Sequence, residues 1–109
     1  MQVVRVVGLP AAPLDAAAEF YREWLPQLTP LPVGEGLDLV LAFAPADHSH
    51  RAWRLAAVQE LARAAAPRRV NAVAADSEAA VAAAVRYLAK APGVTGQYWL
   101  LDAAGAEGA

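Results

Sequence analysis

The chain has 109 residues, of which 58% are hydrophobic, and this is enough for one domain with one packed core. Its net charge of −2 argues against a general nucleic-acid-binding protein, and no apolar run approaches the roughly 18 residues of a membrane span. The sequence has no cysteine, which excludes disulfides and thiolate chemistry, and its first residues do not resemble a signal peptide. We therefore expect a cytoplasmic protein that binds neither nucleic acid nor membrane.

The first half of the chain predicts two strands separated by a helix. Residues 2–7 (QVVRVV) are mostly β-branched and too few for a stable helix, so they predict a strand. Apolar residues recur at helical spacing from about Pro13 to Leu25, and Pro26 is expected to end that helix. The segment 37–43 (LDLVLAF) predicts the second strand. Its alternation places Leu37, Leu39, Leu41 and Phe43 on one face, with Asp38, Val40 and Ala42 on the other.

The second half of the chain predicts two further helix–strand pairs. These are a helix over about 50–65 capped by Asp47 or Ser49, a strand over 69–74, a helix from Asp76 or Ser77 to about Lys90, and a strand over 97–101. Strands that alternate with helices of this length indicate βαβ units and a parallel sheet. We therefore predict an α/β fold, βαβαβαβ, with a four-stranded parallel sheet in one domain over residues 1–102 and a flexible tail over 103–109.

Two motifs of the second half resemble short-chain dehydrogenase/reductases. Residues 69–74 (RVNAVA) resemble the RVNAVAPG segment of that family, and residues 94–97 (VTGQ) with 100–102 (LLD) resemble its VTGQ…VVDGG ending. The resemblance covers about residues 51–105 and implies a Rossmann-like fold. The order of elements extends it backwards: the first strand and its helix are similar to the family's fourth strand and following helix. The chain thus resembles the C-terminal half of the family's fold, with the N-terminal half absent.

The departures from the family concern its chemistry. Gly8 is a lone glycine, not the GxGxxG that the family uses for its cofactor. The family's catalytic Tyr-x-x-x-Lys should fall near the start of the second helix, where residues 43–51 read FAPADHSHR, without tyrosine or lysine. The Pro-Gly that follows RVNAVA in the family is replaced by Ala75 and Asp76. We therefore expect no cofactor and no enzyme activity of the family's kind, as in a pseudoenzyme.

The resemblance also predicts an uncovered sheet face. Strands that follow one another in order, joined by right-handed crossovers, place every helix on the same face. A parallel sheet bare on its other face would need a partner, so we expect a homodimer or a complex with a full-length reductase. The interface candidates are Arg5, Asp38, Trp99 and Asp102. A flavodoxin-like strand order with helices on both sides is the alternative.

The strongest cluster of chemically active residues is Asp47-His48-Ser49-His50, at the carboxyl end of the second strand. Open α/β sheets place their sites at that edge, and two histidines with a carboxylate could act as acid and base or bind a metal. The alternative function is therefore a small enzyme or a metal- or ligand-binding module that uses Asp47, His48 and His50. The same residues can instead be a helix start with a capping residue, and we assign no metal, substrate or catalytic residue.

Other polar and aromatic residues have structural interpretations. The basic stretch is expected to be a solvated helix face and loop, and comprises Arg51, Arg54, Arg63, Arg68 and Arg69. Asn71 predicts a buried amide that ties its strand to a loop, and Asp76 predicts a helix cap. The tryptophans Trp24, Trp53 and Trp99 lie on apolar stripes and are expected in the core.

Overall fold

Four parallel strands and the helices between them make up the fold, in a computed structural model that describes residues 1–28 and 38–101. The strands are β1 (Gln2–Val6), β2 (Leu39–Phe43), β3 (Val70–Ala74) and β4 (Tyr98–Leu100). The helices are α1 (Pro13–Glu19), a π-helical turn (Phe20–Trp24), α2 (Leu25–Leu28), a 3-10 turn (His48–His50), α3 (Arg51–Ala65) and α4 (Glu78–Ala89). The predicted four-stranded α/β fold is confirmed, while Leu37 and the tail 103–109 lie outside the described residues.

The strands lie side by side in chain order, β1-β2-β3-β4, and every neighbouring pair is parallel. Val4, Leu41, Ala72 and Tyr98 form one row across the sheet, and Arg5, Ala42, Val73 and Trp99 form the next. Because side chains alternate along a strand, these two rows point to opposite faces. The consecutive order matches the half-Rossmann arrangement and not the flavodoxin-like one.

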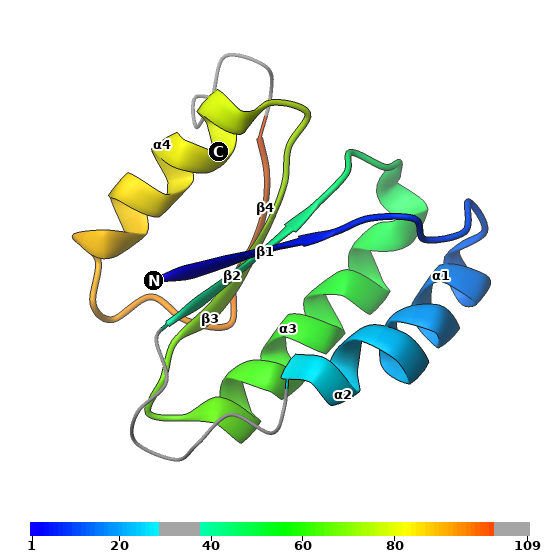
Figure 1. The fold of residues 1–109 in the computed structure, drawn as a ribbon, viewed down its shortest axis with the longest axis horizontal. Coiled ribbons are helices and arrows are strands. Elements are labelled where there is room, and N and C mark those ends of the chain that lie inside the picture. Colours follow the sequence, from blue (N-terminus) through cyan, green and yellow to red (C-terminus); the bar gives the residue numbers. More distant parts are fainter. Residues whose placement is uncertain (29–37, 102–109) are drawn as a thin grey trace.

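Helices cover both faces of this sheet, which corrects the prediction of one bare face. Figure 1 shows the sheet nearly edge-on, with α4 on one side and α1, α2 and α3 on the other. Each strand is added on the same side of the one before it, from β1 to β4. Because α4 lies on the face opposite to α1, α2 and α3, the β3–α4–β4 crossover has the opposite hand to the first two crossovers. This is the rare hand for such a connection. The prediction failed because it assumed a single hand for all three crossovers.

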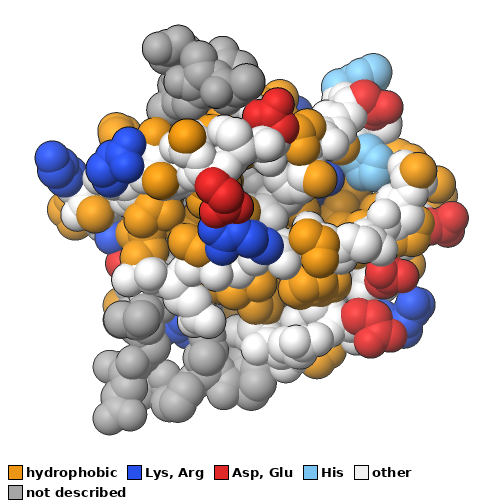
Figure 2. Space-filling view, turned by 45° about the horizontal axis from the view of Figure 1, so that its top comes forward, with side chains coloured by type: hydrophobic (Ala, Val, Ile, Leu, Met, Phe, Trp, Pro, Cys, Tyr) orange, Lys and Arg blue, Asp and Glu red, His pale blue; other side chains and the backbone are white. Residues whose placement is uncertain are grey.

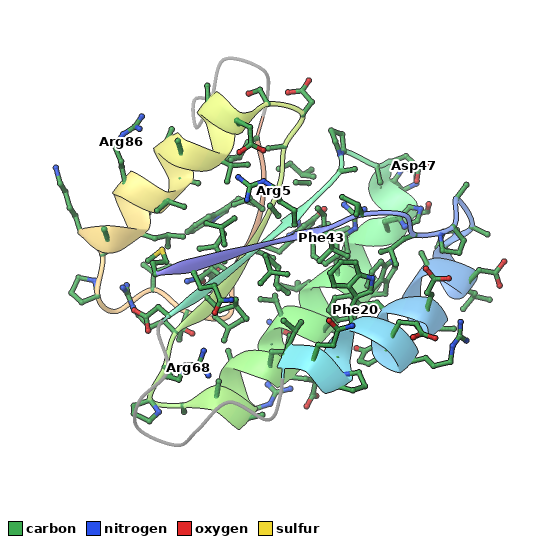
Figure 3. All side chains as sticks on the ribbon, viewed as in Figure 1. Arg5, Phe20, Phe43, Asp47, Arg68 and Arg86 are labelled. Atoms are coloured by element: carbon green, nitrogen blue, oxygen red, sulfur yellow. The ribbon has the colours of Figure 1, made fainter. Side chains whose placement is uncertain are left out.

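The larger hydrophobic core lies between the sheet and the helices α1, α2 and α3. Phe20 and Phe43 are buried there with ring centroids 5.8 Å apart, and Figure 3 shows the two rings between the strands and the helices. Trp53 of α3 contacts both rings, at 5.6 and 5.7 Å between centroids. The apolar face predicted for the second strand supplies Leu39, Leu41 and Phe43 to this core. Trp24 packs against it while remaining half-buried.

The smaller core lies between the sheet and α4, and three polar side chains share this face of the sheet. Val40, Ala42 and Val73 contact the buried side of α4, whose last buried residue is Leu88. Arg5, Asp38 and Asn71 share this face with them, by register and alternation. Each of these three polar side chains has a partner in the same chain, and α4 or the loop after it supplies most of those partners.

One helix boundary differs from the sequence prediction, and at another the structure selects one of the two predicted caps. The first helix continues through Pro26 to Leu28, because the π-helical turn ahead of the proline widens the backbone by one residue and accommodates its ring. The cap of α4 is Ser77, whose hydroxyl accepts a hydrogen bond from the Ala80 amide at 3.1 Å, and not Asp76. Ser77 is the residue directly before the first helical residue, which is where a capping oxygen reaches the free amides.

Within residues 1–28 and 38–101, no helix is long and apolar enough to cross a membrane.

Candidate functional site

A cavity of about 390 Å³ opens at the carboxyl ends of β1 and β2. One wall is the loop after β1, residues 7–11, and the other is the connection from β2 to α3, residues 44–47. His50 and Arg54 complete the lining from the start of α3. Gly8 turns the first loop with a positive φ of 79°, a conformation that favours glycine. This is the edge at which open α/β sheets place their ligands.

Arg54 is the buried cation of this cavity, and it is only 5% exposed. Its Nη1 donates to the main-chain oxygen of Ala44 at 2.9 Å and to the hydroxyl of Tyr98 at 3.0 Å. Its guanidinium carbon lies 4.5 Å from the centroid of the Phe43 ring, within reach of a cation–π interaction. Its Nε is buried and has no hydrogen-bond partner. Among the described residues, no carboxylate pairs with Arg54.

The burial of Arg54 corrects the expectation that it belongs to a solvated basic stretch. Arg51 and Arg63 are indeed exposed, whereas Arg54 is buried. The signal was present in the spacing, since Arg54 precedes Ala57 by three residues and Leu61 by seven. The buried stripe of α3 therefore runs through Arg54, Ala57, Val58 and Leu61.

Of the predicted histidine cluster, His50 and Asp47 line the cavity and His48 does not. His50 is buried, and both of its ring nitrogens are engaged. The Trp53 indole N–H donates to Nδ1 at 3.1 Å, so the ring proton is on Nε2, which lies 3.0 Å from the main-chain oxygen of Ala11. His50 thereby joins the start of α3 to the loop after β1. Figure 2 shows the histidine side chains in pale blue at one end of the molecule, beside hydrophobic side chains.

Asp47 begins the helical segment that leads into α3. Its carboxylate accepts hydrogen bonds from the Ser49 hydroxyl and, at 2.9 Å, from the Ser49 amide. These two hydrogen bonds hold the pKa of Asp47 below its usual range. The predicted capping role is therefore present in the structure, and Figure 3 shows Asp47 at the end of the loop before α3.

A metal site needs several ligands within reach of one point. Within the described part of the chain, no group of three or more histidine, cysteine, aspartate or glutamate side chains is arranged to hold a metal ion. In the histidine loop, hydrogen bonds also occupy both ring nitrogens of His50, whereas a ligating nitrogen must be free.

Comparison with protein-family models matches residues 4–101 to the SDR-like family, described as short chain dehydrogenase-like protein. The chain belongs to this family. The match begins inside β1 and ends just after β4, so it includes residues of all four strands. Comparisons with curated proteins and with solved structures found no match.

Membership of the short chain dehydrogenase-like family gives the cavity a context. The resemblance places the family's Tyr-x-x-x-Lys near the start of α3, where this chain has residues 43–51. Of those residues, 44–47 and His50 line the cavity, and none of them is a tyrosine or a lysine.

The structure places three of the four interface candidates, since Asp102 lies outside the described residues. Arg5 is about half exposed and forms an ion pair with Glu78 of α4. Asp38 lies at the start of β2, paired with Arg69. Trp99 is half-buried against α4, with its ring centroid 5.9 Å from that of Tyr87. These residues are spread over one face and the amino end of the sheet.

Proposed function

We propose that this member of the short chain dehydrogenase-like family is a non-catalytic Rossmann-like domain that works by association, and that a second copy docks at the outer edge of β1. The observation that carries this proposal is the position of β1, which pairs only with β2 among the described strands. Parallel strands are ordinarily interior and covered on both sides. A free edge of this kind is a template for another strand.

The main-chain groups of β1 indicate which residues would pair. The amide of Gln2 donates to the main-chain oxygen of Asp38 at 2.7 Å, so Gln2 directs its hydrogen-bonding groups toward β2. Because these groups alternate along a strand, Val4 and Val6 also face β2, while Val3 and Arg5 direct theirs outward. Two copies of β1 could pair antiparallel about Val4, with Val3 of each opposite Arg5 of the other.

The side chains favour that pairing over others centred nearby. A two-fold axis at Val4 separates the two Arg5 side chains, whereas an axis at Arg5 would place like charges opposite each other, which is destabilising. Arg5 is drawn onto the α4 side by its ion pair with Glu78, so it does not block the edge. Val7, the residue directly after β1, is 66% exposed and adds apolar surface at that end of the strand.

The test is the solution mass of the protein over a wide dilution series, by sedimentation or light scattering. We expect a dimer that dissociates on dilution. Val3→Pro removes one outward amide and spares the hydrogen bonds to β2, so it should give a folded monomer. Val3→Thr keeps the amide and the β-branched shape, and it should remain a dimer.

Three outcomes would overturn the proposal. A protein that is monomeric at every concentration would exclude the dimer. A complex with a full-length reductase instead of a second copy would mean that the partner is a different protein. A dimer that is unaffected by Val3→Pro would mean that the copies associate through another surface.

A further inference from the structure

The guanidinium of Arg54 has an unused binding edge. In a guanidinium group, Nε and Nη2 form the edge that holds a carboxylate with two parallel hydrogen bonds. Arg54 uses only Nη1, for Ala44 and Tyr98, and its buried Nε has no partner. No hydrogen bond from Nη2 to a described residue is present either, and Nη2, unlike Nε, is not enclosed by protein atoms.

The same molecule shows what this edge does elsewhere. Arg69 directs both Nε and Nη2 at one oxygen of Asp38, Oδ2, and each nitrogen lies 2.8 Å from it. Arg5 directs the same two nitrogens at Glu78. In Arg54 the equivalent edge is part of a side chain that is 95% buried, where a charged group without a counter-ion is costly to keep. A negatively charged ligand would supply the counter-ion and the hydrogen-bond acceptor that this guanidinium lacks.

The cavity determines the kind of ligand. Its volume of about 390 Å³ lies in the range of small-molecule sites, which is about 300–1,000 Å³. Its walls combine apolar residues, among them Val6, Leu9, Pro10 and Pro45, with nearly as much polar surface. Arg54 is the one cation in the lining, and the carboxylate of Asp47 also lines the cavity. One positive charge near one negative charge favours a monoanion over a dianion such as phosphate.

We propose that the cavity at the carboxyl ends of β1 and β2 binds a small organic carboxylate, which pairs with the Nη2 of Arg54 while its apolar body contacts the loop after β1. This proposal does not require the dimer, and Val7 borders both the cavity and the β1 edge. It uses the place where the family pattern has its tyrosine and lysine, with a residue that the pattern does not include.

The test is a titration of the full chain with sodium salts of acetate, propionate, butyrate and benzoate. The reporter is the indole N–H signal of Trp53 in nitrogen–proton spectra, because this group donates to His50 in the cavity wall. Sodium chloride at equal ionic strength and inorganic phosphate are the comparison anions. We expect a saturable shift with the carboxylates, tightest for those with an apolar body, and a weaker response to phosphate and chloride.

The variants separate this site from general charge effects. Arg54→Met should weaken carboxylate binding by about tenfold or more. Arg63→Met is the matched control, because Arg63 lies on the same helix, is exposed and pairs with Glu60, so binding should not change. Should Arg54→Met fail to fold, Ala46→Leu fills the cavity and leaves Arg54 intact, and it should abolish binding. Its control is Ala52→Leu, at an exposed position of α3 outside the cavity lining.

Three results would overturn the proposal. They are no saturable shift with any carboxylate, a response that chloride reproduces at the same ionic strength, and tighter binding of phosphate than of every carboxylate. Binding that survives both Arg54→Met and Ala46→Leu would also place the ligand elsewhere.

Discussion

Asp38 and Arg69 join the amino ends of β2 and β3 through two hydrogen bonds to one carboxylate. The Arg69 amide donates to Oδ1 at 2.9 Å, and its Nε donates to Oδ2 at 2.8 Å. The Nη1 of Arg69 also donates to the main-chain oxygens of Leu88 and Ala91, at 3.0 and 2.6 Å. A single ion pair thus links two strands to the end of α4, which is the helix that covers the second face.

This ion pair should make the stability of the protein depend on pH. Burial alone would raise the pKa of Asp38, but the hydrogen bonds and the charge of Arg69 hold it below its ordinary value. A carboxyl with a depressed pKa stabilises the folded state above its unfolded pKa, about 3.9, and loses that contribution as the pH falls through its folded pKa. Asp38→Asn should therefore lower the free energy of unfolding by about 1–3 kcal/mol at neutral pH, and by less below about pH 4.

Urea unfolding of the two proteins at several pH values measures this difference. The control is the same substitution in an Arg69→Gln background, where the carboxylate has already lost its cation and the pH dependence should be much smaller. A gap between wild type and Asp38→Asn that stays constant down to pH values well below about 4 would contradict the assignment.

Asn71 should hold the last strand in place. Its side-chain amide donates to the main-chain oxygen of Val94 at 3.0 Å, and its oxygen accepts from the Gln97 amide at 3.1 Å. Asn71 is 2% exposed, and removing its side chain takes the partner from two main-chain groups in a partly buried region. Asn71→Ala should cost about 1–3 kcal/mol of stability and speed hydrogen exchange at Gln97. Gln97→Ala keeps the main-chain amide and should change neither quantity.

The strands and most of the helices were predictable because their signals are local. The alternation of Leu39, Val40, Leu41 and Ala42 follows from the two-residue period of a strand, and Asn71 was correctly expected to be a buried amide that ties its strand to a loop. The position of α4 was not predictable in this way. The hand of a crossover is a property of three elements together, and the general preference for one hand gave the wrong face.

The candidate site was predictable only in its position. The edge of the sheet and the loop with Asp47 and His50 followed from the order of the elements. The burial of Arg54 did not, because arginine is ordinarily exposed and its long side chain can reach solvent from a partly buried position. What keeps it inside is the set of acceptors from Ala44 and Tyr98, and these come from separate parts of the chain.

His50 should be a neutral ring with its proton on Nε2. Trp53 donates to Nδ1, and the Ala11 oxygen lies beside Nε2, so only this form satisfies both contacts. Nitrogen spectra of the imidazole rings near neutral pH should show this single form for His50. Addition of zinc should leave the His50 signals in place, and the exposed His48 serves as the internal control. Joint zinc-dependent shifts of both rings would instead support a metal site in this loop.

Tyr98 should stabilise the buried Arg54 through its hydroxyl alone. The hydroxyl accepts from Nη1 at 3.0 Å inside the core, while the ring packs edge-on to Phe43 with centroids 6.4 Å apart. Tyr98→Phe keeps the ring and removes one acceptor from a buried cation, so it should lower the free energy of unfolding by about 1–3 kcal/mol. Tyr87→Phe is the matched control, because Tyr87 is 56% exposed, so the free energy of unfolding should hardly change. In an Arg54→Met background, Tyr98→Phe should have a much smaller effect than in the wild type, because the donor is gone. An equal loss in both backgrounds would mean that the hydroxyl acts through some other contact.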